Sequence, residues 1–252
     1  MKKAIFIALC FVMLFALASC GGEEDTGLKP VISYSFDKDE GLTIASGSLE
    51  TDGDRKVLTL TGGGAANSGS YGASVKTDVF EKTDWTNGMT IAFWVKPATK
   101  DAAIAPLYSL DIVDHDAEGY IATTDSLELA INSDGNSGAA DYPRVWADPA
   151  DVGPDAQPIL EAGKWQHIAV VLSSSGFTIY VDGVEHSKPQ LGSSSANCKL
   201  FLDQIKYCYG LELGSWKCQW WGDIEAFEGS YDDFRIYNMA LTAEEVAEVM
   251  KG

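Results

Sequence analysis

An aromatic loop near the end of the chain, residues 215–225, contains the side chains best suited to hold a ligand. It includes the run Trp-Lys-Cys-Gln-Trp-Trp-Gly. Sugars present apolar C–H faces and a rim of hydroxyl groups, so a sugar site needs flat aromatic rings with polar groups at their edges. The loop supplies both kinds of group. The sequence therefore predicts a ligand-binding set that consists of Tyr209, Trp216, Gln219, Trp220, Trp221 and Asp223.

These aromatic residues also have a purely structural interpretation. Tryptophans often pack beneath a loop as a small secondary core, with their N–H groups bonded to the backbone. Three tryptophans so close in sequence cannot all point outward. A buried aromatic cluster and an exposed sugar platform are therefore both open at this point.

Several other catalytic and metal-binding motifs are missing from the sequence. There is no Cys-x-x-Cys pair, and the only histidines are His115, His167 and His186, which argues against a zinc site. There is also no Gly-x-Ser-x-Gly elbow, phosphate-binding loop or dinucleotide fingerprint. The sequence gives no support to zinc chemistry, to a serine nucleophile on such an elbow or to nucleotide binding.

Five cysteines leave an odd number for the folded part of the chain. Cys10 lies in an apolar N-terminal run and Cys20 directly after it, so Cys198, Cys208 and Cys218 remain. Cys208 reads as a strand residue, while the other two lie in loop-like surroundings. We expect Cys198 to pair with Cys218, which would close a loop of about 20 residues; three unpaired thiols are the alternative.

The segment from Gly163 to Gly183 reads as two strands joined by a short turn. Residues 165–172 are rich in aromatic and β-branched side chains and are apolar on both faces, which is typical of a strand inside a sheet that is covered on both sides. Residues 173–176 have turn chemistry, and residues 177–181 alternate again. The pattern predicts an antiparallel hairpin at the centre of an all-β domain.

Short strands are predicted along most of the remaining chain. Candidate strands cover residues 31–36, 55–61, 71–80, 89–95, 107–112, 120–123, 127–131, 144–147, 199–202, 207–213 and 227–237. Residues 132–158 are rich in Gly and Pro and predict a loop. A helix follows Thr242, because Glu245 completes a capping box and Leu241 with Val246 can form a hydrophobic staple.

Three stretches of the chain resemble a known family. The hairpin contains Lys-Trp-Gln-His-Ile-Ala-Val-Val and Ile-Tyr-Val-Asp-Gly, residues 89–97 place a Trp-bearing strand before a Pro, and residues 227–246 read Phe-Glu-Gly-Ser-Tyr-Asp-Asp-Phe-Arg-Ile-Tyr-Asn-Met-Ala-Leu-Thr-Ala-Glu-Glu-Val. These stretches resemble laminin-G-like domains of the concanavalin A-like lectin/glucanase superfamily, with weaker similarity over residues 29–250. The resemblance implies a two-sheet antiparallel jelly-roll β-sandwich with a short C-terminal helix. It also implies sugar binding, glycoside hydrolysis or protein adhesion.

The resemblance implies a calcium site at the edge of the sandwich. Relatives often hold the ion where the first acidic turn meets the closing strand, which here would bring together Asp37, Asp39, Asp232 and Asp233. The match is partial, because residues 45–47 read Ala-Ser-Gly where the family often has Asp-Ser-Ser-Gly. Solvated acids at strand ends are the alternative interpretation.

The resemblance gives little support to catalysis. Hydrolases of the superfamily carry Glu-x-Asp-x-x-Glu on one strand, so that two carboxylates face one cleft. That motif is absent, and the nearest approach, Asp114 to Glu118, reads as an acidic turn. We expect the protein not to be an enzyme.

The N-terminus has the features of a bacterial lipoprotein. Met1-Lys-Lys precedes an apolar run at residues 4–17, too short to span a membrane comfortably, and Leu17-Ala-Ser-Cys20 resembles a lipobox. We expect a signal peptide at residues 1–19, a lipid on Cys20, an acidic flexible tether at residues 20–28 and one domain at residues 29–252. The acidic residues after Cys20 resemble signals for surface display on the outer membrane. An ordinary signal peptide is the alternative.

The strong negative charge excludes some partners. The chain has 18 Lys and Arg against 37 Asp and Glu, a formal charge of −19. Such a chain lacks the basic surface that nucleic acid or anionic lipid requires, so the only membrane contact we expect is through the lipid on Cys20. Together these observations predict a lipid-anchored, non-catalytic module that binds a glycan. A protein-binding adhesion module is the alternative, and a glycoside hydrolase is a third.

Overall fold

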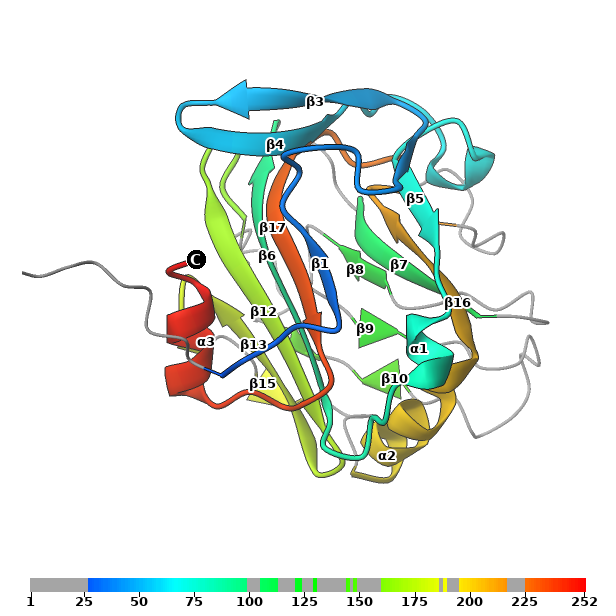
Figure 1. Cartoon of the computed structure of the whole chain (residues 1–252), viewed down its shortest axis with the longest axis vertical. Helices are drawn as coiled ribbons and strands as arrows, with labels where there is room; N and C mark the ends of the chain where they lie inside the picture. The colour runs from blue at the N-terminus through cyan, green and yellow to red at the C-terminus, as the bar shows by residue number, and fades with distance from the viewer. Residues whose placement is uncertain are drawn as a thin grey trace, which may run out of the picture.

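The computed structural model describes residues 27–98, 105–112, 121–123, 129–130, 144–145, 147–148, 160–185, 188–189, 195–216 and 225–252. Two antiparallel sheets pack face to face as a β-sandwich (Figure 1). Most buried apolar side chains lie between the two sheets in one cluster. The expected two-sheet jelly-roll class, with a short C-terminal helix, is confirmed.

The larger sheet has the order β14-β13-β12-β6-β17-β4-β3, with β1 pairing on β17. Its strands are β1 (Ile32–Tyr34), β3 (Gly47–Asp52), β4 (Arg55–Leu60), β6 (Met89–Pro97), β12 (Gln166–Ser173), β13 (Gly176–Val181), β14 (Val184–Glu185) and β17 (Gly229–Tyr237). The first and last strands of the fold thus meet in this sheet, as they should if the chain closes on itself.

The smaller sheet has the order β10-β9-β8-β7-β16-β5-β2. Its strands are β2 (Thr43–Ile44), β5 (Ala73–Lys76), β7 (Pro106–Ile112), β8 (Ile121–Thr123), β9 (Leu129–Ala130), β10 (Arg144–Val145) and β16 (Cys208–Leu213); β11 (Ala147–Asp148) and β15 (Lys188–Pro189) form a separate pair. The helices are η1 (Ala66–Ser68), α1 (Val79–Lys82), α2 (Ser195–Gln204), η2 (Ile205–Tyr207) and α3 (Ala243–Val249).

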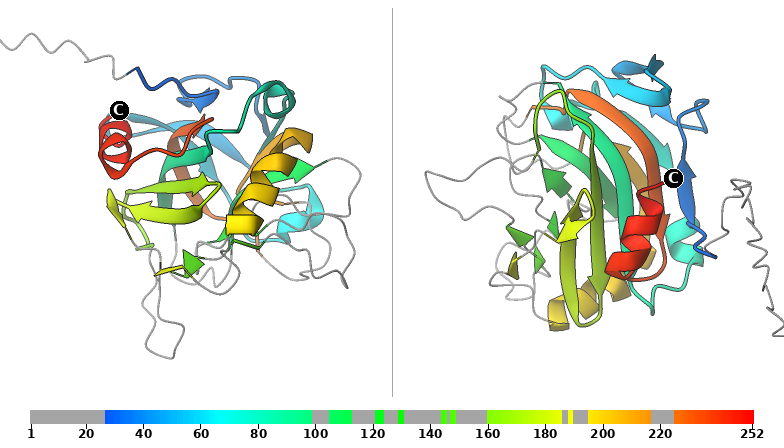
Figure 2. Two further views of the ribbon diagram at one scale, coloured as in Figure 1. Left: turned by 90° about the horizontal axis from the view of Figure 1, so that it is seen from below. Right: turned by 90° about the vertical axis from the view of Figure 1, so that its left-hand side faces the viewer.

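The predicted central hairpin is formed by β12 and β13. Their register runs from Ile168 opposite Val181 to Ser173 opposite Gly176. One face of β12 contributes Ile168 to the main core, while the other contributes Ala169 to a second apolar cluster. That second cluster includes Val246 of α3, and Figure 2 shows the helix lying against the larger sheet. The prediction of a strand covered on both faces is confirmed.

The capping box of α3 is also confirmed. Glu245 N donates to Thr242 Oγ1 at 3.2 Å, and Thr242 N donates to Glu245 Oε2 at 2.7 Å. Leu241 and Val246, the expected staple residues, are buried in the same cluster. These contacts fix where the helix begins, and its apolar face then covers the outer side of the larger sheet.

Two predicted strands are wrong in whole or in part. Residues 199–202 are helical, within α2, because a run of apolar residues this short does not distinguish a buried helix from a strand. The strand expected at residues 71–80 covers only β5, and α1 follows it. Strand β3 was not predicted, since most of its residues are exposed and its apolar pattern is weak.

The expected bridge between Cys198 and Cys218 is not formed, because Cys198 is a free thiol. Helix α2 places Cys198 in the main apolar core instead of in a loop. Cys208 is buried on β16, where its thiol donates to Gly210 O at 3.2 Å. Cys218 itself lies outside the described residues.

The expected signal peptide and most of the expected tether, within residues 1–26, lie outside the described residues. Leu28, at the end of the expected tether, is partly buried and packs against the apolar cluster that includes Val246 of α3. Within the described part of the chain, no helix is long and apolar enough to cross a membrane. The chain therefore enters its folded part beside α3.

Candidate functional site

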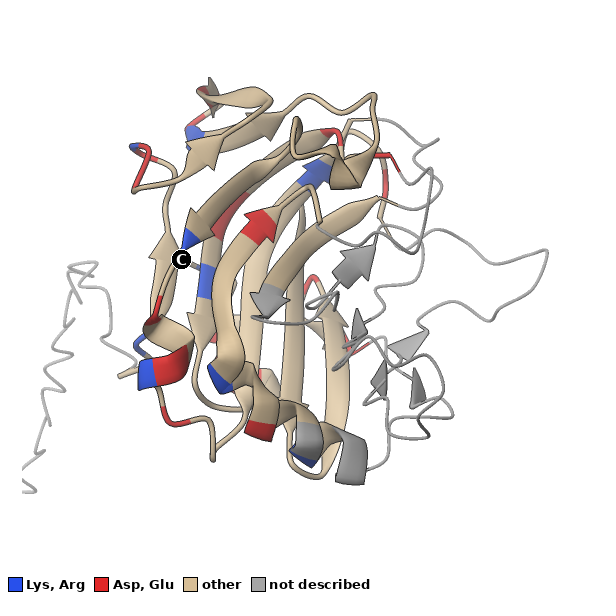
Figure 3. Cartoon of the chain, turned by 90° about the vertical axis from the view of Figure 1, so that its right-hand side faces the viewer, with Lys and Arg blue, Asp and Glu red and all other residues tan. Residues whose placement is uncertain are grey.

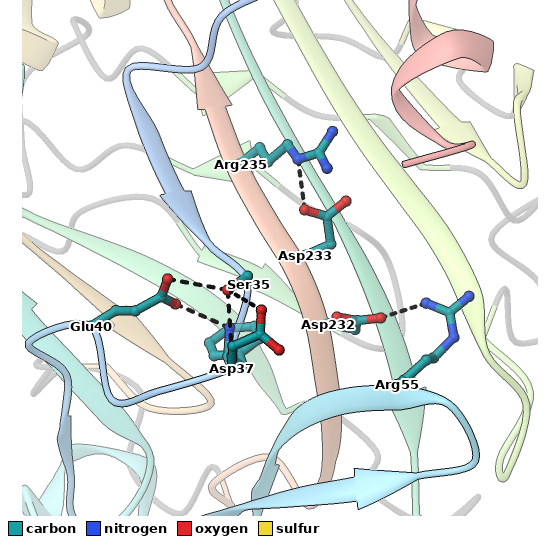
Figure 4. A network of polar contacts seen from close by, with 8 residues as sticks. Ser35, Asp37, Glu40, Arg55, Asp232, Asp233 and Arg235 are labelled. Atoms are coloured by element: carbon teal, nitrogen blue, oxygen red, sulfur yellow. Dashed lines mark hydrogen bonds and ion pairs between the residues drawn. The ribbon is translucent and has the colours of Figure 1, made fainter. Parts of the chain in front are cut away.

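A pocket of about 360 Å³ lies on the outer face of the larger sheet. Its lining comes from the turn after β1, the β3–β4 turn, the middle of β6 and β17, and the C-terminal end of α3. Figure 4 shows Asp37, Arg55 and the acids and arginine of β17 among these residues. The lining residues are Ser35, Asp37, Asp54, Arg55, Lys56, Trp94, Asp232, Asp233, Arg235, Met250, Lys251 and Gly252. Five segments of the chain thus build one polar hollow.

A β-bulge in β17 gives the pocket its wall. Asp232 pairs with Trp94 and Arg235 pairs with Ala92, so β17 uses one residue more than β6 between these points. Asp233 takes the left-handed φ of 51°. Beyond the bulge, side chains of β17 again alternate between the core and the outer face: Phe234 is fully buried, and Arg235 lines the pocket. Without the bulge, two successive acids could not both reach the outer face.

Each of the two acids is paired with an arginine. Arg55 Nη1 lies 2.6 Å from Asp232 Oδ2, and Arg235 Nε lies 2.6 Å from Asp233 Oδ1. The pKa of the Asp233 carboxyl is raised by burial, which outweighs the lowering effect of the Arg235 guanidinium. The four side chains are between 15% and 35% exposed, so water screens the two pairs incompletely.

Arg55 is also held by aromatic rings. Its guanidinium carbon lies 4.5 Å from the ring centroid of Trp94 and 5.3 Å from that of Trp165. Trp165 in turn donates from Nε1 to Asp52 Oδ2 at 2.9 Å, and Lys96 forms an ion pair with the same carboxylate. These bonds from Lys96 and Trp165 lower the pKa of Asp52. Cations and rings therefore alternate over this face, and Arg55 has little freedom to move.

A buried histidine lies beneath these groups. His167 is 2% exposed, and its ring meets the edge of Trp94 at a centroid distance of 5.3 Å. Burial, followed by the nearby charges of Arg235 and Arg55, lowers the pKa of His167 to about 4. Its Nδ1 has no hydrogen-bond partner among the groups that the structure describes. The imidazole is therefore neutral at ordinary pH.

The first acidic turn places Asp37 at the pocket. Ser35 Oγ lies 3.2 Å from both Asp37 Oδ2 and Glu40 Oε1, and Phe36 N donates to Glu40 Oε2 at 3.0 Å. Asp39 accepts from Gly41 N at 3.1 Å and does not line the pocket. The turn is thus closed by its own side chains, with one of its two aspartates facing the hollow.

The structure brings together three of the four predicted calcium ligands, Asp37, Asp232 and Asp233, and leaves Asp39 apart. A calcium ion needs six to eight oxygen ligands, whereas Asp232 and Asp233 are both bound to guanidinium groups. In the described ranges, no three His, Cys, Asp or Glu side chains are grouped so as to hold a metal ion. The described groups therefore give no support to a calcium ion, and calcium binding stays a prediction.

The base of the aromatic loop is fixed to a glycine-rich segment. Trp216 N donates to Ala66 O at 3.3 Å, and Ala226 N donates to Gly64 O at 2.8 Å. The Trp216 side chain packs with Ala66, Ala226 and Tyr71 in a small apolar cluster. At Gly64 a Cβ would come within 2.3 Å of the Tyr71 ring, so only glycine fits there. The loop therefore leaves and re-enters the scaffold at one tightly packed place.

Burial limits what Trp216 can do. The side chain is 3% exposed, so it supports the base of the loop and has no open face for a sugar. Tyr209, on β16, is half-buried. Gln219, Trp220, Trp221 and Asp223 lie outside the described residues, as does the acidic run from Asp114 to Glu118. The expected burial is thus confirmed for Trp216, but the expected bond from its Nε1 to the backbone is not, since this buried atom has no hydrogen-bond partner among the described groups. The sugar-platform role stays a prediction for Trp220 and Trp221.

The sequence alone did not predict several residues of the pocket, above all Arg55, Trp94 and Arg235. The signal for Trp94 was present, because alternation along the strand puts it on the face opposite Phe93 and Val95. Arg235 lies inside the quoted closing run but was not assigned a role. The bulge that brings these groups together has no sequence signal that we could use.

Comparisons with known proteins agree with this architecture. The family model described as "Concanavalin A-like lectin/glucanases superfamily" matches residues 67–247. Among proteins with curated descriptions, none matches the sequence significantly. The confirmed resemblance thus covers most of the chain.

Solved structures that resemble the chain include domain 4 of AbnA, an extracellular arabinanase from Geobacillus stearothermophilus, in complex with arabinotriose. The identity is 18%, the TM-score is 0.50, and the match covers 88% of this chain and 98% of that domain. The binding domain of botulinum neurotoxin DC, in complex with rat synaptotagmin II, matches at 13% identity and a TM-score of 0.52, over 83% of this chain and 46% of that chain. These similarities show a shared fold.

Proposed function

We propose that this chain, which belongs to the Concanavalin A-like lectin/glucanases superfamily, binds glycans without hydrolysing them. It would do so at the surface of a bacterial outer membrane, held there by a lipid on Cys20. The sugar would stack on Trp220 or Trp221, while Gln219 and Asp223 orient its hydroxyl groups.

The observation that carries this proposal is the anchoring of the aromatic loop. Trp216 and Ala226, on either side of residues 217–224, are each bonded to the segment that contains Gly64 and Ala66. Loops held in this way on a rigid sandwich are where binding residues are commonly placed. The AbnA domain, which shares the fold over almost its whole length, was solved with arabinotriose bound, and this supports a glycan as the ligand class.

Two observations favour binding over catalysis. A glycosidase needs one protonated and one free carboxyl group about 5 to 5.5 Å apart in a retaining enzyme. The sequence lacks the paired-carboxylate motif of the hydrolases. In the described pocket, the adjacent acids Asp232 and Asp233 each form an ion pair with an arginine. Neither acid is then free to attack a sugar or to act as a base.

The surface and the position of the tether fit this role. In Figure 3, the positions of Lys and Arg and those of Asp and Glu are scattered along the described ribbon. In Figure 1, α3, beside which Leu28 packs, lies on the opposite side from the short helix η1 between β4 and β5. Because Ala66 of η1 holds the base of the aromatic loop, a tether leaving beside α3 would present that loop away from the membrane.

Affinity electrophoresis in gels that contain polysaccharides tests the proposal. We expect the chain from Gly21 onward to be retarded by at least one neutral polysaccharide, and the double change Trp220→Ala and Trp221→Ala to abolish the retardation. Tyr207→Ala is the matched control, since Tyr207 is an exposed aromatic residue outside the loop. If the Tyr207 variant and the double variant migrate alike, or no gel retards the protein, the glycan-binding proposal is wrong.

A further inference from the structure

We propose that the pocket on the outer face of the larger sheet is a second binding site, for a neutral sugar unit at the end or branch of a glycan. The inference rests on the proposed function only for the ligand class. The pocket lining includes Arg55, Trp94 and Arg235 on the outside of the larger sheet and neither of the described residues at the base of the aromatic loop, Trp216 and Ala226. These two residues pack in a separate apolar cluster with Ala66. The module would then have two contacts with one glycan.

The balance of charge in the pocket selects a neutral ligand. Its lining contains four acidic and four basic side chains, in a protein that otherwise carries a large excess of acid. A hydroxyl group donates one hydrogen bond and accepts others, so a sugar can bond to carboxylates and guanidinium groups alike. Carboxylates on the ligand would face Asp37 and Asp54, and a metal ion would face Arg55 and Arg235.

The polar groups are held in place before any ligand arrives. Arg55 contacts two tryptophan rings and forms an ion pair with Asp232, while Arg235 forms an ion pair with Asp233 at the bulge. Planar guanidinium and carboxylate groups of this kind can each contact two neighbouring hydroxyl groups. Little side-chain entropy remains to be lost on binding, which favours affinity.

The size and floor of the pocket fit one end of a sugar chain. Its volume of about 360 Å³ is near the lower limit of ordinary ligand pockets, which begin at roughly 300 Å³. Trp94 and Met250 supply apolar surface among the charged groups. A hollow this small suits a terminal or branching unit better than several consecutive units of a backbone.

An NMR titration of the ¹⁵N-labelled chain from Gly21 onward tests the inference. This chain is suitable because the described apolar cores use only residues from Leu28 onward. Arabinotriose and cellotriose are the neutral probes, and trigalacturonate is the acidic probe. We expect a neutral probe to shift the Nε–H signals of Trp94, Arg55 and Arg235 in a saturable way, with affinity changing less than about twofold in high salt, because no net charge is bound.

A pair of substitutions in one turn supplies the matched control. Asp37→Asn removes a carboxylate that lines the pocket, whereas Asp39→Asn removes one that does not. We expect the first to weaken binding of the neutral probe at the pocket signals by about tenfold or more, as for the loss of a charged hydrogen-bond acceptor, and the second to leave it unchanged.

Four results would overturn the inference. Neutral probes that shift only signals outside the pocket, with binding lost in the Trp220→Ala, Trp221→Ala variant, would leave the proposed function standing without a second site. Binding of trigalacturonate alone, or binding that needs calcium, would contradict a neutral ligand. Equal losses in the Asp37 and Asp39 variants would contradict a contact at Asp37. Saturable binding of neither neutral probe would count against both proposals.

Discussion

Arg55 shows how single residues shape this surface. It occupies a position that sequence alternation leaves undistinguished, yet it contacts Trp94, Trp165 and Asp232 at once. His167 lies directly under this group, buried and neutral, next to two fixed positive charges. Protonation of His167 would place a third positive charge beside Arg55 and Arg235.

Because of His167, the free energy of unfolding should decrease as the pH is lowered. Its pKa is about 4 in the folded protein and about 6.5 in an unfolded chain. The unfolded state therefore binds a proton first, and stability is greatest above pH 6.5 and falls as the pH drops toward 4. Between pH 7 and 4.5 we expect His167 to cost about 2 kcal/mol in the free energy of unfolding.

Urea unfolding at these two pH values checks this. Carboxyl groups with lowered pKa values, such as Asp52, also reduce stability as the pH falls, in the parent and in the variant alike. The His167→Gln protein therefore serves as the reference. The loss of stability from pH 7 to 4.5 should be smaller in His167→Gln than in the parent. Equal losses would mean that His167 is not buried as a neutral ring.

Gly229 at the start of β17 should not tolerate a side chain. Its φ is 153°, and a Cβ would lie 2.5 Å from Lys96 O and 2.6 Å from the Phe227 ring. We expect Gly229→Ala to lower the free energy of unfolding by about 2 kcal/mol or more, because backbone and a packed ring must both move. Gly176→Ala is the control, since a Cβ there meets nothing within 4 Å. Similar stabilities for the two variants would refute this close packing.

The elements differ in how well the sequence predicted them. β12 was identified because it is apolar on both faces, and α3 because its cap has a specific residue pattern. Local signals of this kind specify local structure. Residues 199–202 of helix α2 were predicted as a strand, because the apolar residues of this segment show no clear helical period in the sequence. Their burial in the core is a result of tertiary packing.

The candidate site is built by contacts between residues far apart in sequence. Fewer of its residues were therefore predicted than of the strands and helices. Asp37, Asp232 and Asp233, which the resemblance to the family places together, line one pocket, while their role as calcium ligands stays a prediction. The arginines that pair with these acids reach them through strand register and through a bulge at Asp233. Register and bulges follow from the packing of whole sheets, so neither could be read from the order of residues.

The cap of α3 should contribute measurably to stability. We expect Thr242→Ala to lower the free energy of unfolding by about 1 kcal/mol, since the N–H of Glu245 then loses its acceptor. Thr242→Ser should restore most of the loss, because serine caps helices equally well. Thermal and urea unfolding measure both. A serine variant as unstable as the alanine variant would show that the cap is not the cause.

At the scale of the whole molecule, the expected anchor and the folded domain meet beside α3, where Leu28 packs. If Cys20 carries a lipid, Cys20→Ala should move the protein from the membrane fraction to the soluble fraction of the cells that produce it. Cys10→Ala, inside the apolar run, is the matched control and should stay with the membrane. Identical fractionation of the two variants would contradict lipid anchoring at Cys20.

The central claim is that the domain binds glycans through its aromatic loop. The most direct measurement is the intrinsic tryptophan fluorescence of the chain from Gly21 onward, titrated with a panel of polysaccharides with and without calcium. We predict a saturable spectral shift that disappears in Trp220→Ala and Trp221→Ala while the fold stays intact. The absence of any response to the whole panel, with iodide unable to quench these tryptophans, would contradict the account and would favour a protein-binding role.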